Sequence, residues 1–188
     1  MYYSQFGEDE FLDKHCQLPE KGVFVDVGAG GIENSNSYYF EQKGWQCLCI
    51  EPDKRHIGLD KRKLVDNRVV GDEEKEVDFV YHHEPSLSGL HHHNKSVSVS
   101  LPMFKLDTIL ANYDIKKIDI LSIDTEGNEL AVLKGFSIDK YEPKYIIIEY
   151  KSWAVGDQEN QICQLLKGYR VVHKTPANLI MEKEVEKC

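Results

Sequence analysis

The stretch from residue 21 to residue 51 constrains the fold more than any other part of the sequence. Residues 22–27 (GVFVDV) are apolar and β-branched, which is typical of a parallel strand buried on both faces. Residues 28–31 (GAGG) follow directly, and their missing side chains let backbone come close to a ligand. Residues 46–50 (QCLCI) predict a second buried strand, which ends at Glu51. A carboxylate roughly 20 residues after a glycine turn can hold two ribose hydroxyls, so this stretch predicts a nucleoside-binding unit.

The glycine spacing narrows the kind of nucleoside. A dinucleotide fold uses G-x-G-x-x-G, so that a pyrophosphate rests on the helix N-terminus. Gly28 and Gly30 match that pattern, but the third position is Glu33, an anion where phosphate would lie. An acid suits a ligand with positive charge, and S-adenosylmethionine carries a sulfonium and an α-ammonium group. Residues 25–30 and 50–52 thus resemble class I methyltransferases, in which the first-strand acid, here Asp26, helps to place the methionine moiety; the alternative is an unrelated α/β domain.

Length, composition and charge exclude several classes of protein. The 188 residues are 41% hydrophobic and 29% charged, which fits one globular domain over residues 1–188. Asp plus Glu number 32 against 23 Lys plus Arg, giving a net charge of −9, so a nucleic-acid partner is not expected. The sequence begins without a basic segment followed by an apolar one, and no apolar stretch is long enough to span a bilayer. We therefore expect no membrane insertion and a cytoplasmic location.

Short motifs along most of the chain resemble the FkbM-type methyltransferase family. They are SQFGED at 4–9, NSNS at 34–37, GW at 44–45, IEP at 50–52, LDT at 106–108 and IDTEGNE at 123–129. The motifs are specific in combination and ordinary singly, and together they cover residues 4–150. The resemblance implies an S-adenosylmethionine-dependent enzyme that methylates hydroxyls of sugars, glycolipids or other small natural products, so the expected partner is a small-molecule or glycan acceptor.

The residues and the resemblance together give a set of expected cofactor-binding positions. These are Gln5, Asp26, Gly28, Ala29, Gly30, Asn36, Ser37, Glu51, Pro52, Gly71, Asp72 and Asp124. Asp72 has two interpretations of equal weight. It either accepts a hydrogen bond from the adenine amine, or it is a turn residue beside two glutamates.

The remaining pattern predicts alternating helices and strands. After an N-terminal helical segment (1–20), helices are expected over 35–43, 53–65, 106–110, 126–134 and 158–167, and further strands over 68–70, 76–81, 97–101, 118–123, 145–149, 169–173 and 179–181. Alone, this supports a mixed α/β sheet with helices on both faces. The resemblance implies a Rossmann-like doubly wound sheet of about seven strands, mostly parallel, with an antiparallel final hairpin.

A histidine-rich stretch, residues 82–96, separates two of the expected strands. Of the three consecutive histidines, only His91 and His93 share a face of an extended chain, so a metal site there is disfavoured. We expect a substrate-facing loop instead, because binding residues concentrate on loops. One imidazole in it could serve as a general base, but the sequence singles none out.

Three carboxylates are the candidates for catalysis: Asp124, Glu126 and Glu149. Asp124 and Glu149 end strands that we place side by side, at the edge where open α/β sheets bind ligands. Glu126 could also simply stabilise the start of a helix. The three acids either share a divalent cation that activates an acceptor hydroxyl, or form a metal-free site in which Asp124 orients the acceptor or takes its proton. The sequence favours the metal-free form.

Two other functions are compatible with parts of the pattern. A nicotinamide-dependent oxidoreductase would explain Glu51 but not the glycine spacing. A non-catalytic S-adenosylmethionine-binding module would keep the fold without the chemistry. The acids at three strand ends, Glu51, Asp124 and Glu149, weigh against such a module.

Overall fold

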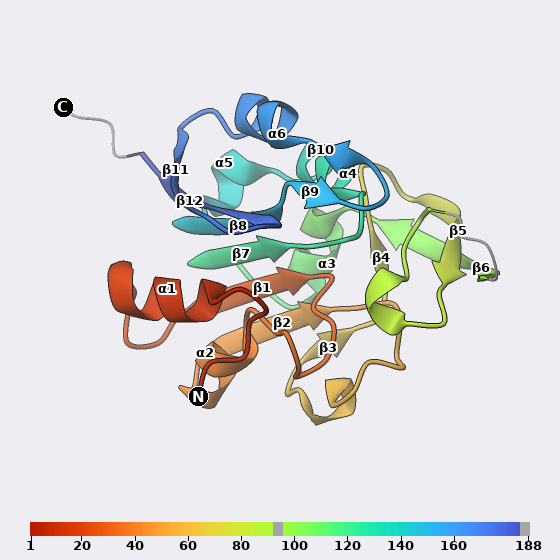
Figure 1. Ribbon diagram of the computed structural model, residues 1–188, viewed down its shortest axis with the longest axis horizontal. Coiled ribbons are helices and arrows are strands. Elements are labelled where there is room, and N and C mark those ends of the chain that lie inside the picture. The colour runs from red at the N-terminus through yellow and green to blue at the C-terminus, as the bar shows by residue number, and fades with distance from the viewer. Residues whose placement is uncertain (92–95, 185–188) are drawn as a thin grey trace.

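The computed structural model describes residues 1–91 and 96–184, and a seven-stranded sheet forms its centre (Figure 1). The strand order is β11-β12-β8-β7-β1-β2-β3. The five strands from β8 to β3 pair in parallel, whereas β12 runs antiparallel to β8 and β11 antiparallel to β12. The bounds are β1 Val23–Val27, β2 Gln46–Ile50, β3 Val65–Asp66, β7 Ile120–Ile123, β8 Tyr145–Glu149, β11 Tyr169–Lys174 and β12 Asn178–Lys183. This sheet confirms the predicted α/β class, including the antiparallel final hairpin.

Helices cover both faces of the sheet, which is why its central strands are apolar along their whole length. On one face α1 (Glu8–His15) and α2 (Tyr38–Gln42) pack against Phe24 of β1. On the other face α3 (Leu106–Asn112), α4 (Glu129–Lys134), α5 (Ile138–Tyr141) and α6 (Glu159–Leu165) pack against Val25 and its neighbours. Successive side chains of a strand point to opposite faces, so β1 contributes to both cores. Within the described ranges, no helix combines the length and the apolar character that crossing a membrane requires.

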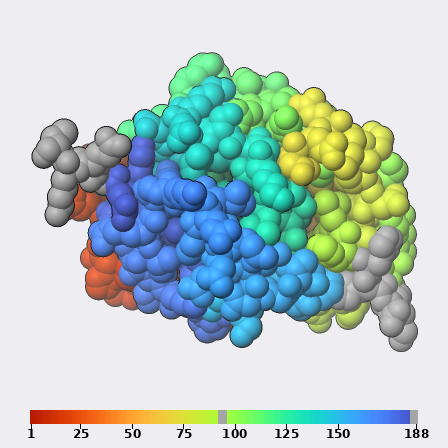
Figure 2. All heavy atoms as spheres, turned by 90° about the horizontal axis from the view of Figure 1, so that it is seen from above, coloured from red at the N-terminus to blue at the C-terminus, as the bar shows by residue number. Residues whose placement is uncertain are grey.

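A second, smaller sheet lies beyond the carboxyl ends of the parallel strands (Figure 1). Its order is β4-β6-β5, with β4 Val69–Val70, β5 Lys75–Tyr81 and β6 Val97–Phe104. Two 3-10 turns, η1 (Leu59–Lys61) and η2 (Pro85–Leu87), and a short hairpin of β9 (Lys151–Ser152) and β10 (Gly156–Asp157) complete the structure. In the surface view of Figure 2 the C-terminal half, cyan to blue, covers much of one face, and the yellow-green residues of the small sheet form the adjacent end.

Three of the expected elements differ in the structure: one helix is absent, one begins later than expected, and one strand belongs to the other sheet. Residues 53–65 form turns and η1 instead of a helix, because Asp53 accepts a hydrogen bond from the Arg55 amide (3.0 Å) and Gly58 is left-handed (φ 78°). The helix expected over 126–134 begins only at Glu129, since Glu126 and Gly127 have positive φ angles of 55° and 103°.

The expected third strand, 68–70, also differs from its prediction. The edge of the main sheet is β3, and residues 69–70 pair instead with β6 of the small sheet. A turn separates the two, in which Asp66 accepts from both the backbone and the guanidinium of Arg68 (2.9 Å each). The chain therefore leaves the main sheet after Asp66, before the residues that the apolar pattern assigned to this strand.

Candidate active site

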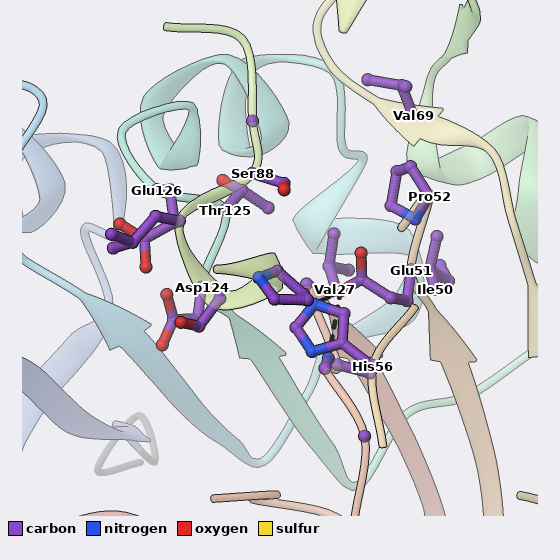
Figure 3. A pocket seen from close by; sticks show the side chains of 18 of the residues that line it. Val27, Ile50, Glu51, Pro52, His56, Val69, Ser88, Asp124, Thr125 and Glu126 are labelled. Carbon is purple, nitrogen blue, oxygen red and sulfur yellow. Dashed lines mark hydrogen bonds and ion pairs between the residues drawn. The ribbon is translucent and has the colours of Figure 1, made fainter. Parts of the chain in front are cut away.

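A pocket of about 650 Å³ lies at the carboxyl ends of β1, β2 and β7, between the main sheet and the small one (Figure 3). Its size falls in the range usual for small-molecule sites. Of the residues expected from the sequence, its walls include Gln5, Gly28, Ala29, Gly30, Glu51, Pro52, Asp124 and Glu126. In Figure 3, Glu51 and His56 lie at one end of the pocket and Asp124 and Glu126 at the other. The pocket thus has carboxylates at both of its ends.

The glycine loop closes the bottom of the pocket through close backbone packing. Gly28 donates to the Ile50 carbonyl (2.9 Å) and has a left-handed φ of 75°. A Cβ there would lie 1.6 Å from the Asp124 carbonyl oxygen, so only glycine fits between the ends of β2 and β7. Gly30 is also left-handed (φ 56°), but a Cβ would meet nothing nearer than the His56 ring at 3.6 Å. Close packing therefore requires glycine at position 28, whereas a Cβ at position 30 would fit without a clash, beside the His56 ring.

Glu51 holds the glycine loop and the second-strand tip together. Its Oε2 accepts from the Gly30 amide (3.0 Å), its Oε1 accepts from the Asp53 amide (2.8 Å), and His56 Nε2 lies 3.7 Å from Oε2. Burial raises the pKa of Glu51 to about 7, although the two amide hydrogen bonds oppose the rise. Each carboxylate oxygen has a second lone pair, so two hydroxyls of a ligand can still be accepted.

The SQFGED segment (residues 4–9) is folded by its own hydrogen bonds so that Gln5 lines the pocket. Asp9 accepts from the Ser4 hydroxyl (2.6 Å) and the Tyr3 amide (2.6 Å), while its own amide donates to Ser4 Oγ (3.2 Å). Glu8 is fully buried and accepts from Asn178 Nδ2 (2.8 Å) on β12. Ser4 also forms a parallel bridge with Asn34 in the glycine loop. These contacts explain the polar residues of SQFGED as the means of holding one segment over the site.

Three of the expected cofactor residues, Asp26, Asn36 and Ser37, lie behind the pocket wall in a buried polar network. Ser37 Oγ donates to Asp26 Oδ2 (2.5 Å) and accepts from Arg62 Nη2 (2.7 Å). Asn36 Nδ2 donates to Ser122 Oγ (3.2 Å) on β7. Burial raises the pKa of Asp26, against the effect of the Ser37 hydroxyl and the Arg62 charge. In this structure these side chains bind one another and do not line the pocket.

Gly71 and Asp72 also lie away from the pocket. They follow β4 in the small sheet, where a Cβ on Gly71 would lie 2.2 Å from Met103 Sδ. Asp72 is exposed, which agrees with its interpretation as a turn residue. Val69 and Val70, just before them, line the pocket instead.

The three candidate catalytic carboxylates converge. One oxygen each of Asp124, Glu126 and Glu149 can be chosen so that all lie within 4.8 Å of one another. The pairing of β7 with β8 produces this convergence, because Ile123 and Ile148 are register partners and an acid follows each. Burial raises the pKa of all three carboxyls, that of Glu126 to about 7, and their mutual repulsion raises the pKa of Asp124 and Glu149 further.

Residues 85–90 of the histidine-rich loop line the pocket, as does the glycine loop. The described histidines have separate settings: His82 is buried against His83 (Nε2 to Nδ1, 3.1 Å), and His91 Nε2 lies 3.4 Å from the Gly127 carbonyl. Residues 92–95, and with them His93, lie outside the described residues, so the prediction that the consecutive histidines form no metal site stays untested.

Sequence reasoning missed a charged network that joins this loop to the second-strand tip. The Arg55 guanidinium donates to both carboxylate oxygens of Asp53 and to the His82 carbonyl (2.6 Å), and Ser88 Oγ donates to Asp53 Oδ2 (2.8 Å). Asp53 is fully buried under these contacts. An acid directly after the I-E-P motif was visible in the sequence, but its partner 35 residues later was not.

The parallel sheet, the left-handed glycine loop and the acid at the second-strand tip define a class I methyltransferase fold. The sequence profile described as Methyltransferase FkbM domain matches residues 23–171, which is most of the chain. The chain therefore belongs to the FkbM methyltransferase family, as its motifs indicated. No curated protein matches the sequence significantly.

Proposed function

We propose that the protein is an S-adenosylmethionine-dependent O-methyltransferase that acts on a hydroxyl of a sugar, a glycolipid or another small natural product. The observation that carries the proposal is Glu51, a pocket carboxylate fixed to the Gly30 amide (3.0 Å) with lone pairs left for two ribose hydroxyls. Glu33 also lines the pocket, where it suits a cationic ligand better than a pyrophosphate. The pocket volume, about 650 Å³, accommodates a nucleoside with room for a second small molecule.

When bound, the donor supplies an electrophilic methyl group on a sulfonium with a neutral thioether as leaving group. The role of the protein is then mainly alignment of the two reactants. Glu51 would hold the ribose at one end of the pocket, and Asp124 with Glu126 would face the acceptor at the other (Figure 3). The acceptor oxygen forms a bond to the methyl carbon, the carbon–sulfur bond breaks toward sulfur, and the hydroxyl proton has to leave. The carboxylate cluster would assist that last step, either as a base or by holding an ion that acidifies the hydroxyl.

Two experiments test the proposal in sequence. Titration calorimetry compares binding of S-adenosylhomocysteine with that of NAD⁺ and NADH. Saturable binding of S-adenosylhomocysteine alone supports the proposal, and binding of only the nicotinamide cofactor would overturn it. Mass spectrometry of glycans and hydroxylated metabolites incubated with methyl-labelled donor then identifies the acceptor, and label found on nitrogen or carbon would refute O-methylation. The cytoplasmic location stays a prediction.

A further inference from the structure

The three clustered carboxylates have the spacing of ligands around one ion. Magnesium binds oxygen at about 2.0–2.1 Å and calcium at about 2.3–2.6 Å, so two ligand oxygens of one ion lie at most about 4–5 Å apart. Oxygens of Asp124, Glu126 and Glu149 all lie within 4.8 Å of one another. They come from two strands and one loop, since Asp124 follows β7, Glu149 ends β8 and Glu126 sits in the turn before α4. Carboxylate oxygens favour Mg²⁺, Mn²⁺ or Ca²⁺ over zinc.

A second observation points to a ligand at the same place. Glu149 is only 7% exposed, yet its Oε2 has no hydrogen-bond partner in the part of the chain that the structure describes. The nearby Glu129 differs, because its Oε1 accepts from the Thr125 amide (2.8 Å), the Thr125 hydroxyl (3.0 Å) and the Gly127 amide (3.1 Å). A buried carboxylate oxygen without a donor costs free energy that a bound cation would remove. Glu129 organises the loop, whereas Glu149, which also hydrogen-bonds to the Glu129 side chain, keeps its buried Oε2 without a partner in the described residues.

Basic side chains do not neutralise the cluster. Across residues 1–91 and 96–184, no Lys or Arg forms an ion pair with Asp124, Glu126 or Glu149. The Trp153 indole donates a hydrogen bond to Glu126. The indole is neutral, so it supplies no positive charge to the cluster. Three acids held together without a cation repel one another unless they are protonated or bridged by an ion.

We propose that Asp124, Glu126 and Glu149 bind one divalent cation through oxygen ligands. Asp124 and Glu126 line the pocket, so an ion held by the three side chains would have open positions toward an acceptor. There it would bind the acceptor hydroxyl and lower its pKa, and the hydroxyl would lose its proton to water as the oxygen attacks the methyl carbon. The catalytic role rests on the proposed function, but the ion site rests only on the carboxylate geometry. It replaces the metal-free form that the sequence favoured.

The test measures binding of Mn²⁺ alone, with neither donor nor acceptor present. Electron paramagnetic resonance of free Mn²⁺ should show one bound ion per chain, and Glu149→Gln and Asp124→Asn should each weaken binding at least tenfold. Glu73→Gln is the matched control, because Glu73 is an exposed glutamate paired with Lys75, outside the cluster. Wild-type protein that binds no Mn²⁺ at millimolar concentration would overturn the proposal. So would a folded Glu149→Gln protein that binds like the parent.

Thermal unfolding provides a second measurement that does not depend on activity. Saturating Mn²⁺ should raise the Tm of the wild type by at least about 4 °C at 100 times Kd. Glu149→Gln should have a higher Tm than the metal-free parent, because the glutamine side chain needs neither a proton nor an ion to be neutral in the buried cluster, and Mn²⁺ should not raise the Tm of this variant further. If Glu149→Gln does not fold, Glu126→Gln in the half-buried loop gives the same readout. An equal Mn²⁺-induced shift in parent and variant would contradict the assignment.

A luminescence experiment locates the ion. Terbium prefers oxygen ligands as Ca²⁺ does, and Trp153 beside Glu126 is the tryptophan placed to sensitise its emission. Trp45, the other of the two tryptophans, is buried against Phe40 near α2. With light that tryptophan absorbs and tyrosine does not, Trp153→Phe should therefore abolish sensitised emission while Mn²⁺ still binds, and emission that persists would place the ion elsewhere. Calorimetry with S-adenosylhomocysteine on the same samples separates loss of the ion from failure of the proposed function.

Discussion

The Glu51 carboxylate accepts a hydrogen bond from the backbone amide of Gly30, 3.0 Å away, although the two residues follow different strands. The glycine loop and the second-strand tip therefore fix each other before any ligand binds. Glu51 is also the carboxylate that the proposed function assigns to the ribose. The site is preorganised at this end, and the first three predictions follow from that contact.

Glu51→Ala should weaken binding of S-adenosylhomocysteine at least tenfold. The variant loses two charge-assisted hydrogen bonds, each worth about 1.5–3 kcal/mol at the upper range. Calorimetry measures the change, and circular dichroism checks that the protein is folded. Glu73→Ala, which removes an exposed glutamate elsewhere, should bind like the parent. Unchanged affinity in folded Glu51→Ala would remove Glu51 from the binding site.

Affinity for S-adenosylhomocysteine should rise with pH between 5.5 and 8. Burial raises the pKa of Glu51 to about 7, and ribose hydroxyls donate to the ionised form. If only that form binds, affinity at pH 5.5 is lower by up to about 30-fold, the factor for 1.5 pH units. In Glu51→Gln the affinity should no longer depend on pH over this range. If the pH dependence persists, it belongs to another group such as His56, whose pKa is lowered by burial.

The raised pKa of Glu51 affects folding stability in the opposite direction: as pH rises, ligand affinity increases but the stability of the fold decreases. A carboxyl whose pKa is higher in the folded state binds protons more tightly there than in the unfolded chain. The stabilising contribution of protonated Glu51 is thus fully present below about pH 4.3 and is lost as pH rises through about 7. Urea unfolding of the wild type and Glu51→Gln, at pH 5 and pH 8, should show that the stability advantage of Gln over Glu grows with pH. An advantage that shrinks would contradict the raised pKa.

Gly30→Val should abolish donor binding in a protein that still folds. A valine at φ 56° is strained by about 1–3 kcal/mol, and its side chain would lie against the His56 ring in the pocket wall. Gly168→Val is the matched control, because Gly168 is also left-handed (φ 93°) and a Cβ there meets nothing within 4 Å. Urea titration should show a similar decrease in the free energy of unfolding for both variants. In calorimetry, only Gly30→Val should fail to bind S-adenosylhomocysteine. Equal affinity in the two variants would mean that the ligand lies elsewhere.

Arg62→Met should destabilise the fold by about 3–5 kcal/mol. Arg62 is buried, and it donates to Glu41 (3.0 Å) and to Ser37 (2.7 Å), which in turn donates to Asp26. Without the guanidinium, two carboxylates stay buried with no counter-charge. Urea denaturation measures the loss, and Arg170→Met, which breaks an exposed pair with Glu182, should cost less than about 1 kcal/mol. A loss of that small size in Arg62→Met would show that the network contributes little.

The sequence predicts the main sheet well because burial on both faces leaves a plain signal. The apolar runs of β1, β2, β7 and β8 each end in or beside an acid, and parallel strands bring those acids to one edge. The position of Asp26 was also readable in principle. Side chains alternate along a strand, so Asp26 shares a face with Phe24, under α2, and not with the pocket.

Other features depend on contacts that no local pattern contains. Residues 69–70 are as apolar as a central strand, yet an Asp66–Arg68 turn sends them to the small sheet. The contact of Arg55 with the His82 carbonyl joins residues 27 positions apart, which composition and periodicity do not register. Local sequence patterns predict which residues are buried and where turns occur. They do not predict which polar side chains distant in the sequence become partners, because that depends on the complete fold.

The network of Asp53, Arg55 and Ser88 has a consequence for engineering acceptor choice. Under the proposed function this loop faces the acceptor and the strand tip holds the donor. The network ties the two together, so the loop cannot be exchanged independently. A loop transplanted from another family member would need a hydroxyl at the position of Ser88 and a carbonyl in reach of Arg55. A graft without them would remove the Ser88 hydroxyl from buried Asp53. Under the proposed function it would disturb donor binding before it changed the acceptor.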